Sequence, residues 1–90
     1  MTRPAYAAAG SDTLPPLTLY RHRGEAGVSA YALLPDAIIV RFHGGATYRY
    51  GPRHPGSDHV EAMKQLACAG RGLSSYISRH VREDYEARLA

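Results

Sequence analysis

The chain has 90 residues, enough for one small domain with one modest core and too few for a separate catalytic domain. Its formal net charge of +3 predicts mild attraction to polyanions, although the arginine bias, with Lys64 the one lysine among 11 basic residues, can also reflect GC-rich codons. A single cysteine, Cys68, excludes an intramolecular disulfide framework and favours a reducing cytoplasm. No apolar run approaches the roughly 18 residues of a membrane span, and we expect neither a signal peptide nor a membrane partner.

The chain begins with a stretch that has little to bury. Residues 1–14 are rich in Ala, Gly, Ser, Thr and Pro, which predicts a flexible tail ahead of one domain over residues 15–90. Residues 17–20 alternate well enough for a short strand, and whether they form one stays open. Residues 28–34 are a stronger strand, whose even-numbered side chains, Ala30 and Ala32 among them, should face the core.

Residues 37–50 contain the strongest strand formers and predict a β-hairpin around Gly44-Gly45. A two-residue type I′ turn would put Tyr48 and Tyr50 on the surface face. A three-residue loop, 43–45, would instead pair Val40 with Tyr48 and bring both tyrosines to the border of the core. We favour the longer loop because it gathers the apolar side chains on one face and leaves Arg41, Thr47 and Arg49 on the wetter one.

Two helices should follow the hairpin. The first is predicted from about residue 58 to 69, capped by Ser57 or Asp58 and ended by Gly70. The second should run on to Leu89, because apolar residues recur at i+4 steps, and Ser74 or Ser75 should cap it. Its outer face would carry the ion pairs Arg79–Glu83 and Arg82–Glu86. The predicted fold is therefore α+β: a three-stranded antiparallel β-meander, or a four-stranded one, followed by two packed α-helices.

The predicted core combines the inward positions of the strands and both helices. It consists of Ala30, Ala32, Ile38, Val40, Phe42, Val60, Met63, Leu66, Ile77 and Val81.

Several features follow one another in a distinctive order. They are Ser29, Val40-Arg41-Phe42 with Gly45, Tyr48-Arg49-Tyr50, Ala67 to Arg71, Leu73-Ser74-Ser75, Ile77 and Tyr85. Over about residues 27–89 this ordered set resembles the KTSC domain, a small module named after its occurrence at the end of some lysyl-tRNA synthetases. The chain departs from the family pattern at Cys68, Ala69 and Leu73-Ser74, where the family has serine, lysine and Phe-Asn. The resemblance implies a module for which RNA binding has been suggested from the attachment to a synthetase.

The sequence shows no enzymatic constellation, and we expect no catalytic residue, no cofactor and no metal. Cys68 lies at the alanine-rich end of a predicted helix, where a small buried thiol is the usual role. The five histidines have no recognised ligand spacing. His54 and His59 flank a helix start and could meet, but surface histidines are the better interpretation.

Tyrosine and arginine together favour a nucleic-acid surface, because a tyrosine ring stacks on bases while guanidinium groups hold phosphates. The candidate binding residues are Arg41, Tyr48, Arg49, Tyr50, Arg53, Arg71 and Ser74. The main hypothesis is a non-enzymatic module that binds RNA or single-stranded nucleic acid weakly, as a monomer or weak dimer. The alternative is a protein-interaction adaptor that uses a sheet edge or the segment 17–20. For Tyr48 and Tyr50 themselves, a mainly structural role at the boundary between sheet and helices is the favoured interpretation.

Overall fold

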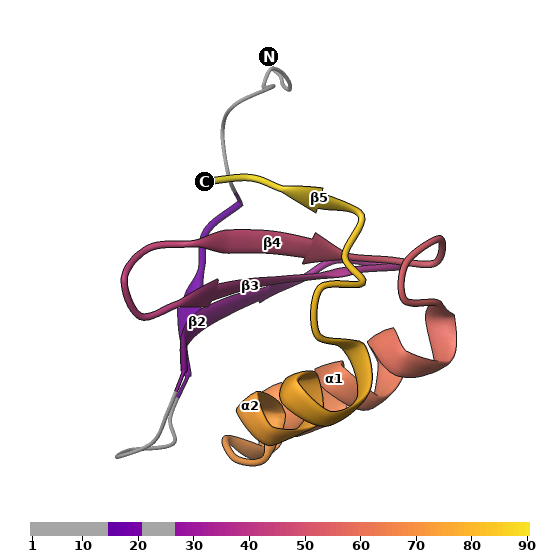
Figure 1. The fold of residues 1–90 in the computed structure, drawn as a ribbon. Coiled ribbons are helices and arrows are strands. Elements are labelled where there is room, and N and C mark those ends of the chain that lie inside the picture. The colour runs from indigo at the N-terminus through magenta and orange to yellow at the C-terminus, as the bar shows by residue number, and fades with distance from the viewer. Residues whose placement is uncertain (1–14, 21–26) are drawn as a thin grey trace.

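The computed structural model describes residues 15–20 and 27–90, so the predicted tail, 1–14, lies outside the described residues. Five antiparallel strands form one sheet in the order β1-β2-β3-β4-β5, and the helices pack on one face of it (Figure 1). The predicted α+β class, a β-meander followed by helices, is confirmed. In chain order the elements are β1 (Thr18–Leu19), β2 (Val28–Leu33), β3 (Ile38–Phe42), β4 (Thr47–Tyr50), α1 (Ser57–Ala69), α2 (Leu73–Tyr76), the π-helical turn η2 (Ile77–Val81) and β5 (Ala87–Arg88).

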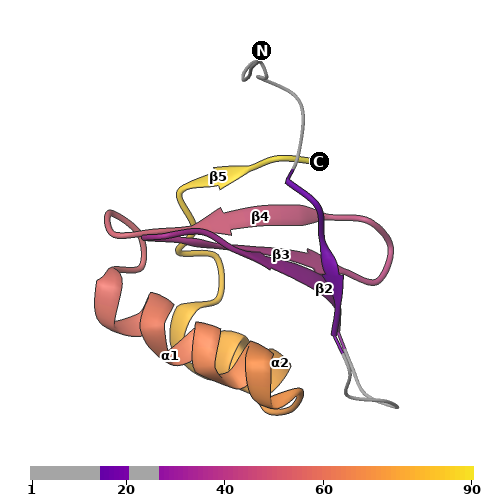
Figure 2. The same cartoon turned by 180° about the vertical axis from the view of Figure 1, so that it is seen from behind.

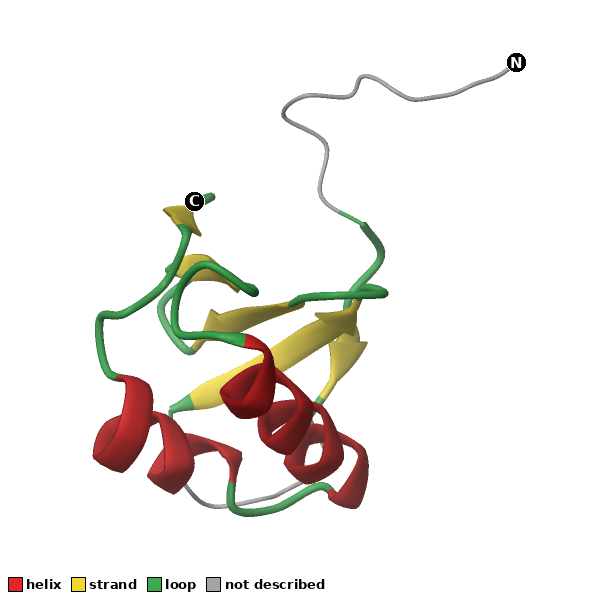
Figure 3. Ribbon diagram, turned by 90° about the vertical axis from the view of Figure 1, so that its right-hand side faces the viewer, coloured by secondary structure: helices red, strands yellow, loops and turns green. Residues whose placement is uncertain are grey.

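The helices form a single layer. Figure 2 shows them on the same side of the sheet from behind, and Figure 3 shows them next to each other when the molecule is turned by 90°. Within residues 15–20 and 27–90, no helix has both the length and the apolar character that crossing a membrane requires.

The central hairpin has the three-residue loop that the sequence favours. Val40 pairs with Tyr48, so the loop spans residues 43–45. Gly44 and Gly45 have φ angles of 98° and 103°, values that residues with a Cβ atom rarely adopt. Both tyrosines of β4 therefore lie on the helix side of the sheet.

A bulge in β2 changes which of its residues face the helices. The register shifts between Val28 and Ala30, so that Tyr31 pairs with Val40 and packs against the core. Ala30 and Ala32 consequently lie on the opposite face. The prediction that these two alanines belong to the core beneath the helices is wrong, although both side chains are buried.

The segment at residues 17–20 does form a strand. β1 pairs with β2, with Thr18 opposite Tyr31 and Leu19 opposite Ala30. The hydroxyl of Tyr20 accepts a hydrogen bond from the backbone N–H of Leu73 at 3.0 Å, which ties this edge of the sheet to the start of α2. The meander before the helices is thus four-stranded.

Helix α1 begins at a glycine and not at a side-chain cap. Gly56 is the N-cap residue, with φ 116° and no side-chain hydrogen bond, which places Ser57 and Asp58 inside the first turn. The predicted caps are therefore wrong. At the other end, Gly70 adopts the left-handed conformation with φ 79°, as predicted, and donates to carbonyls of the last turn.

The second helix starts in the same way. Gly72 is its N-cap residue with φ 87°, so the predicted caps Ser74 and Ser75 are wrong. The Ser74 hydroxyl oxygen instead accepts a hydrogen bond from the backbone N–H of Val28 at 3.1 Å. Ser74 therefore joins the helix layer to β2.

The predicted second helix ends at Val81 instead of near Leu89. At its end the Arg82 N–H donates to the carbonyl of Ile77 at 2.6 Å, a π-type bond, and Arg82 itself has φ 43°. The chain then turns back to the sheet, where β5 pairs with the outer side of β4. This pairing satisfies backbone groups of β4 that a longer helix would leave open.

The predicted intrahelical ion pairs are also wrong, because the helix ends before their acidic partners can align. Nε of Arg82 donates to the carbonyl of Ser78 at 3.1 Å. Glu86 lies beyond the helix and accepts hydrogen bonds from Arg49 of β4 and from the backbone of Arg53.

The core lies between the sheet and the helices. Phe42 and Leu66, two of its predicted members, are only partly buried and pack at its border. The central cluster consists of Val28, Ile38, Val40, Tyr50, Val60, Met63, Ala67, Leu73, Ile77 and Val81.

Candidate functional site

The sheet separates the residues that the sequence predicts as a binding surface. Tyr48 and Tyr50 pair with residues on the helix side, whereas Arg41 and Arg49 alternate with them and project from the opposite face. Arg71 is exposed in the loop between α1 and α2, within the helix layer. Together with Ser74, which is held by β2, these residues do not form one surface.

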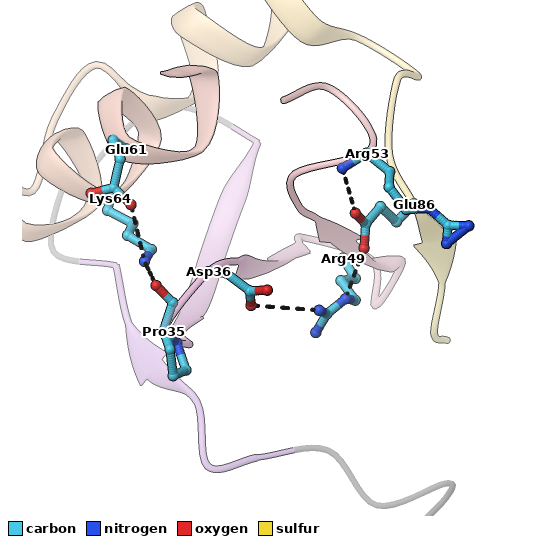
Figure 4. Close-up of polar contacts among 7 residues, drawn as sticks. All are labelled: Pro35, Asp36, Arg49, Arg53, Glu61, Lys64 and Glu86. Carbon is cyan, nitrogen blue, oxygen red and sulfur yellow. Dashed lines mark hydrogen bonds and ion pairs between the residues drawn. The ribbon is translucent and has the colours of Figure 1, made fainter. Parts of the chain in front are cut away.

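The arginines of the opposite face are engaged within the protein. Nε of Arg41 donates to the Thr47 hydroxyl at 3.2 Å. Arg49 forms an ion pair with Glu86 at 3.0 Å and a longer one with Asp36 at 3.8 Å, as Figure 4 shows. The charge of Arg49 is thereby largely neutralised, which makes it a poor phosphate ligand.

Glu86 joins three parts of the chain. Its carboxylate accepts from Nε of Arg49 and, at 2.9 Å, from the backbone N–H of Arg53 (Figure 4). The hydrogen bond from Arg53 and the nearby Arg49 guanidinium hold the pKa of Glu86 below its usual value. A Cβ at Gly51 would lie 2.5 Å from a Glu86 oxygen, so only glycine leaves room for this contact. The backbone N–H of Arg53 thus makes a contact that holds the fold together.

Tyr50 lies in the core. Its exposed fraction is 1%, so its ring has no open face for a base. Its hydroxyl makes no hydrogen bond to the described residues, and burial, with smaller effects of Tyr48 and Tyr85, raises its pKa. This agrees with the structural interpretation of Tyr50.

Tyr48 belongs to an aromatic cluster at the loop end of the hairpin. Its ring centroid lies 4.3 Å from that of Tyr85, with the planes tilted by 31°. The Phe42 ring meets it edge-on at 5.8 Å. The guanidinium carbon of Arg88, from β5, lies 5.8 Å from the Tyr48 ring centroid, within the range of a cation–π contact.

This cluster borders an open pocket of about 460 Å³. The pocket lies where the hairpin loop of the sheet meets the end of η2. Its lining consists of Phe42, Ala46, Tyr48, Tyr50, Arg82, Glu83 and Tyr85. Aromatic rings, a guanidinium and a carboxylate thus surround one cavity.

Sequence reasoning placed only two of the lining residues, Tyr48 and Tyr50, in a site. It missed Arg82, Glu83 and Tyr85 because it assigned them to a helix that the structure ends at Val81. One signal was available: four-residue steps advance about 400° around a helix, so a stripe repeated at i+4 drifts by roughly 40° per step. Such a stripe cannot keep one face toward the core up to Leu89.

His54 and His59 have separate hydrogen-bond partners. His54 Nδ1 lies 2.9 Å from a carboxylate oxygen of Asp84, and His59 Nδ1 lies 2.7 Å from the hydroxyl of Tyr76. His54 and His59 therefore do not meet. No group of three or more potential metal ligands occurs among the residues that the structure describes.

The thiol of Cys68 is exposed on α1. The expectation of a buried thiol is therefore wrong. Cys68 lies one position after the inward-facing Ala67, and a step of about 100° around the helix turns it toward solvent.

Comparisons with protein-family models, with curated proteins and with solved structures found no match to this chain. The resemblance to the KTSC domain stays a prediction.

Proposed function

We propose that the protein is a small, non-enzymatic binding module that takes up single-stranded nucleic acid, RNA above all, at the aromatic pocket. The observation that carries this proposal is one cavity lined by aromatic rings and a guanidinium group, with a second guanidinium packed on one of these rings. Tyr48 and Tyr85 supply ring surface, Arg82 lines the cavity, and Arg88 lies over the Tyr48 ring. The KTSC-like features, with the RNA binding suggested for that family, point the same way.

The aromatic part of the pocket suits a base. The Tyr48 and Tyr85 rings are already packed on each other, so a base can contact them without the cost of separating them. Stacking of a base on an aromatic side chain contributes about 1 to 3 kcal/mol and accepts every base.

Arg82 in the pocket and Arg88 next to the Tyr48 ring suit the phosphates. Nε of Arg82 donates to the backbone oxygen of Ser78 and Nε of Arg88 to the backbone oxygen of Ala90, and these contacts orient both side chains. Neither guanidinium forms an ion pair with an acidic side chain in the described part of the chain. Unlike Arg49, they keep a positive charge that a phosphate can neutralise.

The first test compares two arginine pairs in binding to a labelled, uridine-rich single-stranded RNA of about a dozen nucleotides. Arg82→Ala with Arg88→Ala should weaken binding and make the log-log salt slope shallower by about 1.4, because a single-strand contact contributes about 0.7. The control is Arg71→Ala with Arg79→Ala, which removes the same charge from exposed positions of the helix layer.

Fluorescence anisotropy between about 50 and 200 mM salt measures both quantities. An equal loss in the control pair would show that net charge alone drives binding. The absence of binding by the wild-type protein at tens of micromolar and low salt would remove the proposal.

The remaining functional expectations are proposals as well. We propose a cytoplasmic location, because an exposed thiol at Cys68 stays reduced there. We propose a monomer or weak dimer, because both edge strands, β1 and β5, have only two residues.

A protein-interaction adaptor is the second candidate, and one observation favours it. Leu19 is 76% exposed in β1, at the edge of the sheet. A partner strand could pair with this edge and cover the leucine. Salt separates the candidates, since an apolar protein contact should persist between about 50 and 200 mM while phosphate binding weakens steeply.

A further inference from the structure

The pocket is lined by one carboxylate, that of Glu83, which has no partner within the described residues, whereas the acidic residues that follow it in the chain have partners. Asp84 contacts His54, and Glu86 binds Arg49 and Arg53. Glu83 lines the pocket, and its side chain makes no hydrogen bond or ion pair within residues 15–20 and 27–90. In a site that binds a polyanion, a carboxylate opposes the ligand unless it accepts hydrogen bonds from it.

From this we propose that Glu83 makes the pocket selective for guanine in a single strand, an inference that rests on the proposed function. An ionised carboxylate only accepts hydrogen bonds, and its two oxygens lie side by side. Guanine presents two adjacent donors, N1–H and the N2 amino group, on its Watson–Crick edge. Adenine, cytosine and uracil each present one donor there beside an acceptor, and that acceptor would repel the carboxylate. Guanine is therefore the base that uses both oxygens of Glu83.

The charges of the pocket decide against a different occupant. Aromatic rings beside a carboxylate can also hold a methylated ammonium group. Here, however, Arg82 lines the same cavity and Arg88 lies over the Tyr48 ring. Two positive groups against one negative group disfavour a cation and favour a base that is attached to phosphates.

The experiment uses RNAs of about eleven nucleotides with a single test nucleotide at the centre of a uridine strand. Guanosine at that position should bind about 5- to 100-fold tighter than adenosine, cytidine or uridine, the range of a good bidentate contact. Inosine, which keeps N1–H and lacks the N2 amino group, should lose most of this preference.

Two variants locate the preference. Glu83→Gln should bring the guanosine strand close to the all-uridine strand, because an amide offers only one acceptor oxygen. Asp58→Asn removes the same charge from an exposed position on α1 and should keep the preference.

The outcomes separate the inference from the proposed function. Equal affinity for all test nucleotides, with the arginine effects intact, would overturn guanine selectivity and leave single-strand binding in place. Loss of the preference in Asp58→Asn as well would show a general charge effect and also overturn it. Guanosine monophosphate binding as tightly as the guanosine strand would overturn the commitment to a single strand. Binding of a trimethyllysine peptide in place of any RNA would overturn both proposals.

Discussion

At the residue scale, Tyr48 and Tyr50 show how position along one strand separates two roles. Both face the helices, because they alternate with Arg49. Tyr50 pairs with Ile38 inside the core and is 1% exposed, whereas Tyr48 lies nearer the hairpin loop, is half-buried and reaches the pocket. Tyr50 therefore supports the fold, and Tyr48 is the ring that a ligand can contact.

The buried hydroxyl of Tyr50 predicts alkaline sensitivity. Its pKa in the fold is raised above the ordinary value of 10.0, so the folded state holds the proton more tightly than the unfolded state. The contribution to stability is complete below about pH 10 and falls as the pH rises above it. Tyr50→Phe should thus unfold at nearly the same urea concentration as wild type at pH 8 and be more stable, by up to about 1 kcal/mol, at pH 11.

Tyr31→Phe is the matched control, since Tyr31 also packs at the core but is less buried. A Tyr50→Phe protein that loses as much stability as wild type between the two pH values would contradict this explanation.

At the scale of elements, the segment from Arg82 to Ala90 changes from a predicted helix to a strand that closes the sheet. β5 pairs with β4, and Glu86 adds two contacts to this pairing. Its carboxylate accepts hydrogen bonds from Arg49 of β4 and from the N–H of Arg53 in the turn between β4 and α1. The same segment brings Tyr85 against Tyr48. The pocket therefore exists only when this segment docks.

The contacts of Glu86 predict acid sensitivity. Because its pKa is lowered in the fold, this glutamate contributes stability above its ordinary pKa of 4.5 and loses the contribution as the pH falls below that value. Glu86→Gln should be less stable than wild type by about 1 kcal/mol at pH 7, with the gap closing toward pH 3. Denaturant unfolding at the two pH values measures it, and an unchanged gap at pH 3 would argue against an ionic role.

At the scale of the whole molecule, the apolar side chains concentrate on one side of the sheet. Met63 of α1 is completely buried against this side, whereas Leu19 of β1 is 76% exposed. Met63→Ala should lower the free energy of unfolding by about 2 to 5 kcal/mol, a large part of what a domain of this size has. Leu19→Ala should change it by less than about 0.5 kcal/mol. Thermal and urea denaturation of both variants measure these changes. Similar losses of stability in Met63→Ala and Leu19→Ala would refute the expectation.

Local chemistry was enough to predict the elements that depend on neighbours in the chain. The β-branched run before Gly44-Gly45 predicted the hairpin and its three-residue loop, and the apolar spacing up to Gly70 predicted the first helix. These features depend on side-chain alternation and on backbone freedom at glycine, which act over a few residues. The α+β class followed from the order of these elements.

Only the tertiary structure decided the features that depend on distant partners. The bulge after Val28 is not encoded in the alternating pattern of β2, because alternation alone cannot show where a pairing register shifts. The apolar residues after Val81 have a helical spacing. The chain nevertheless pairs with the edge of β4 there, and the contacts of Glu86 stabilise this pairing. Strand pairing between residues about forty positions apart competes there with local helix propensity, and its strength depends on what the rest of the chain has already placed nearby. The pocket lies between the hairpin of β3 and β4 and the residues that follow Val81. For that reason Arg82, Glu83 and Tyr85 could not be assigned to it from the sequence.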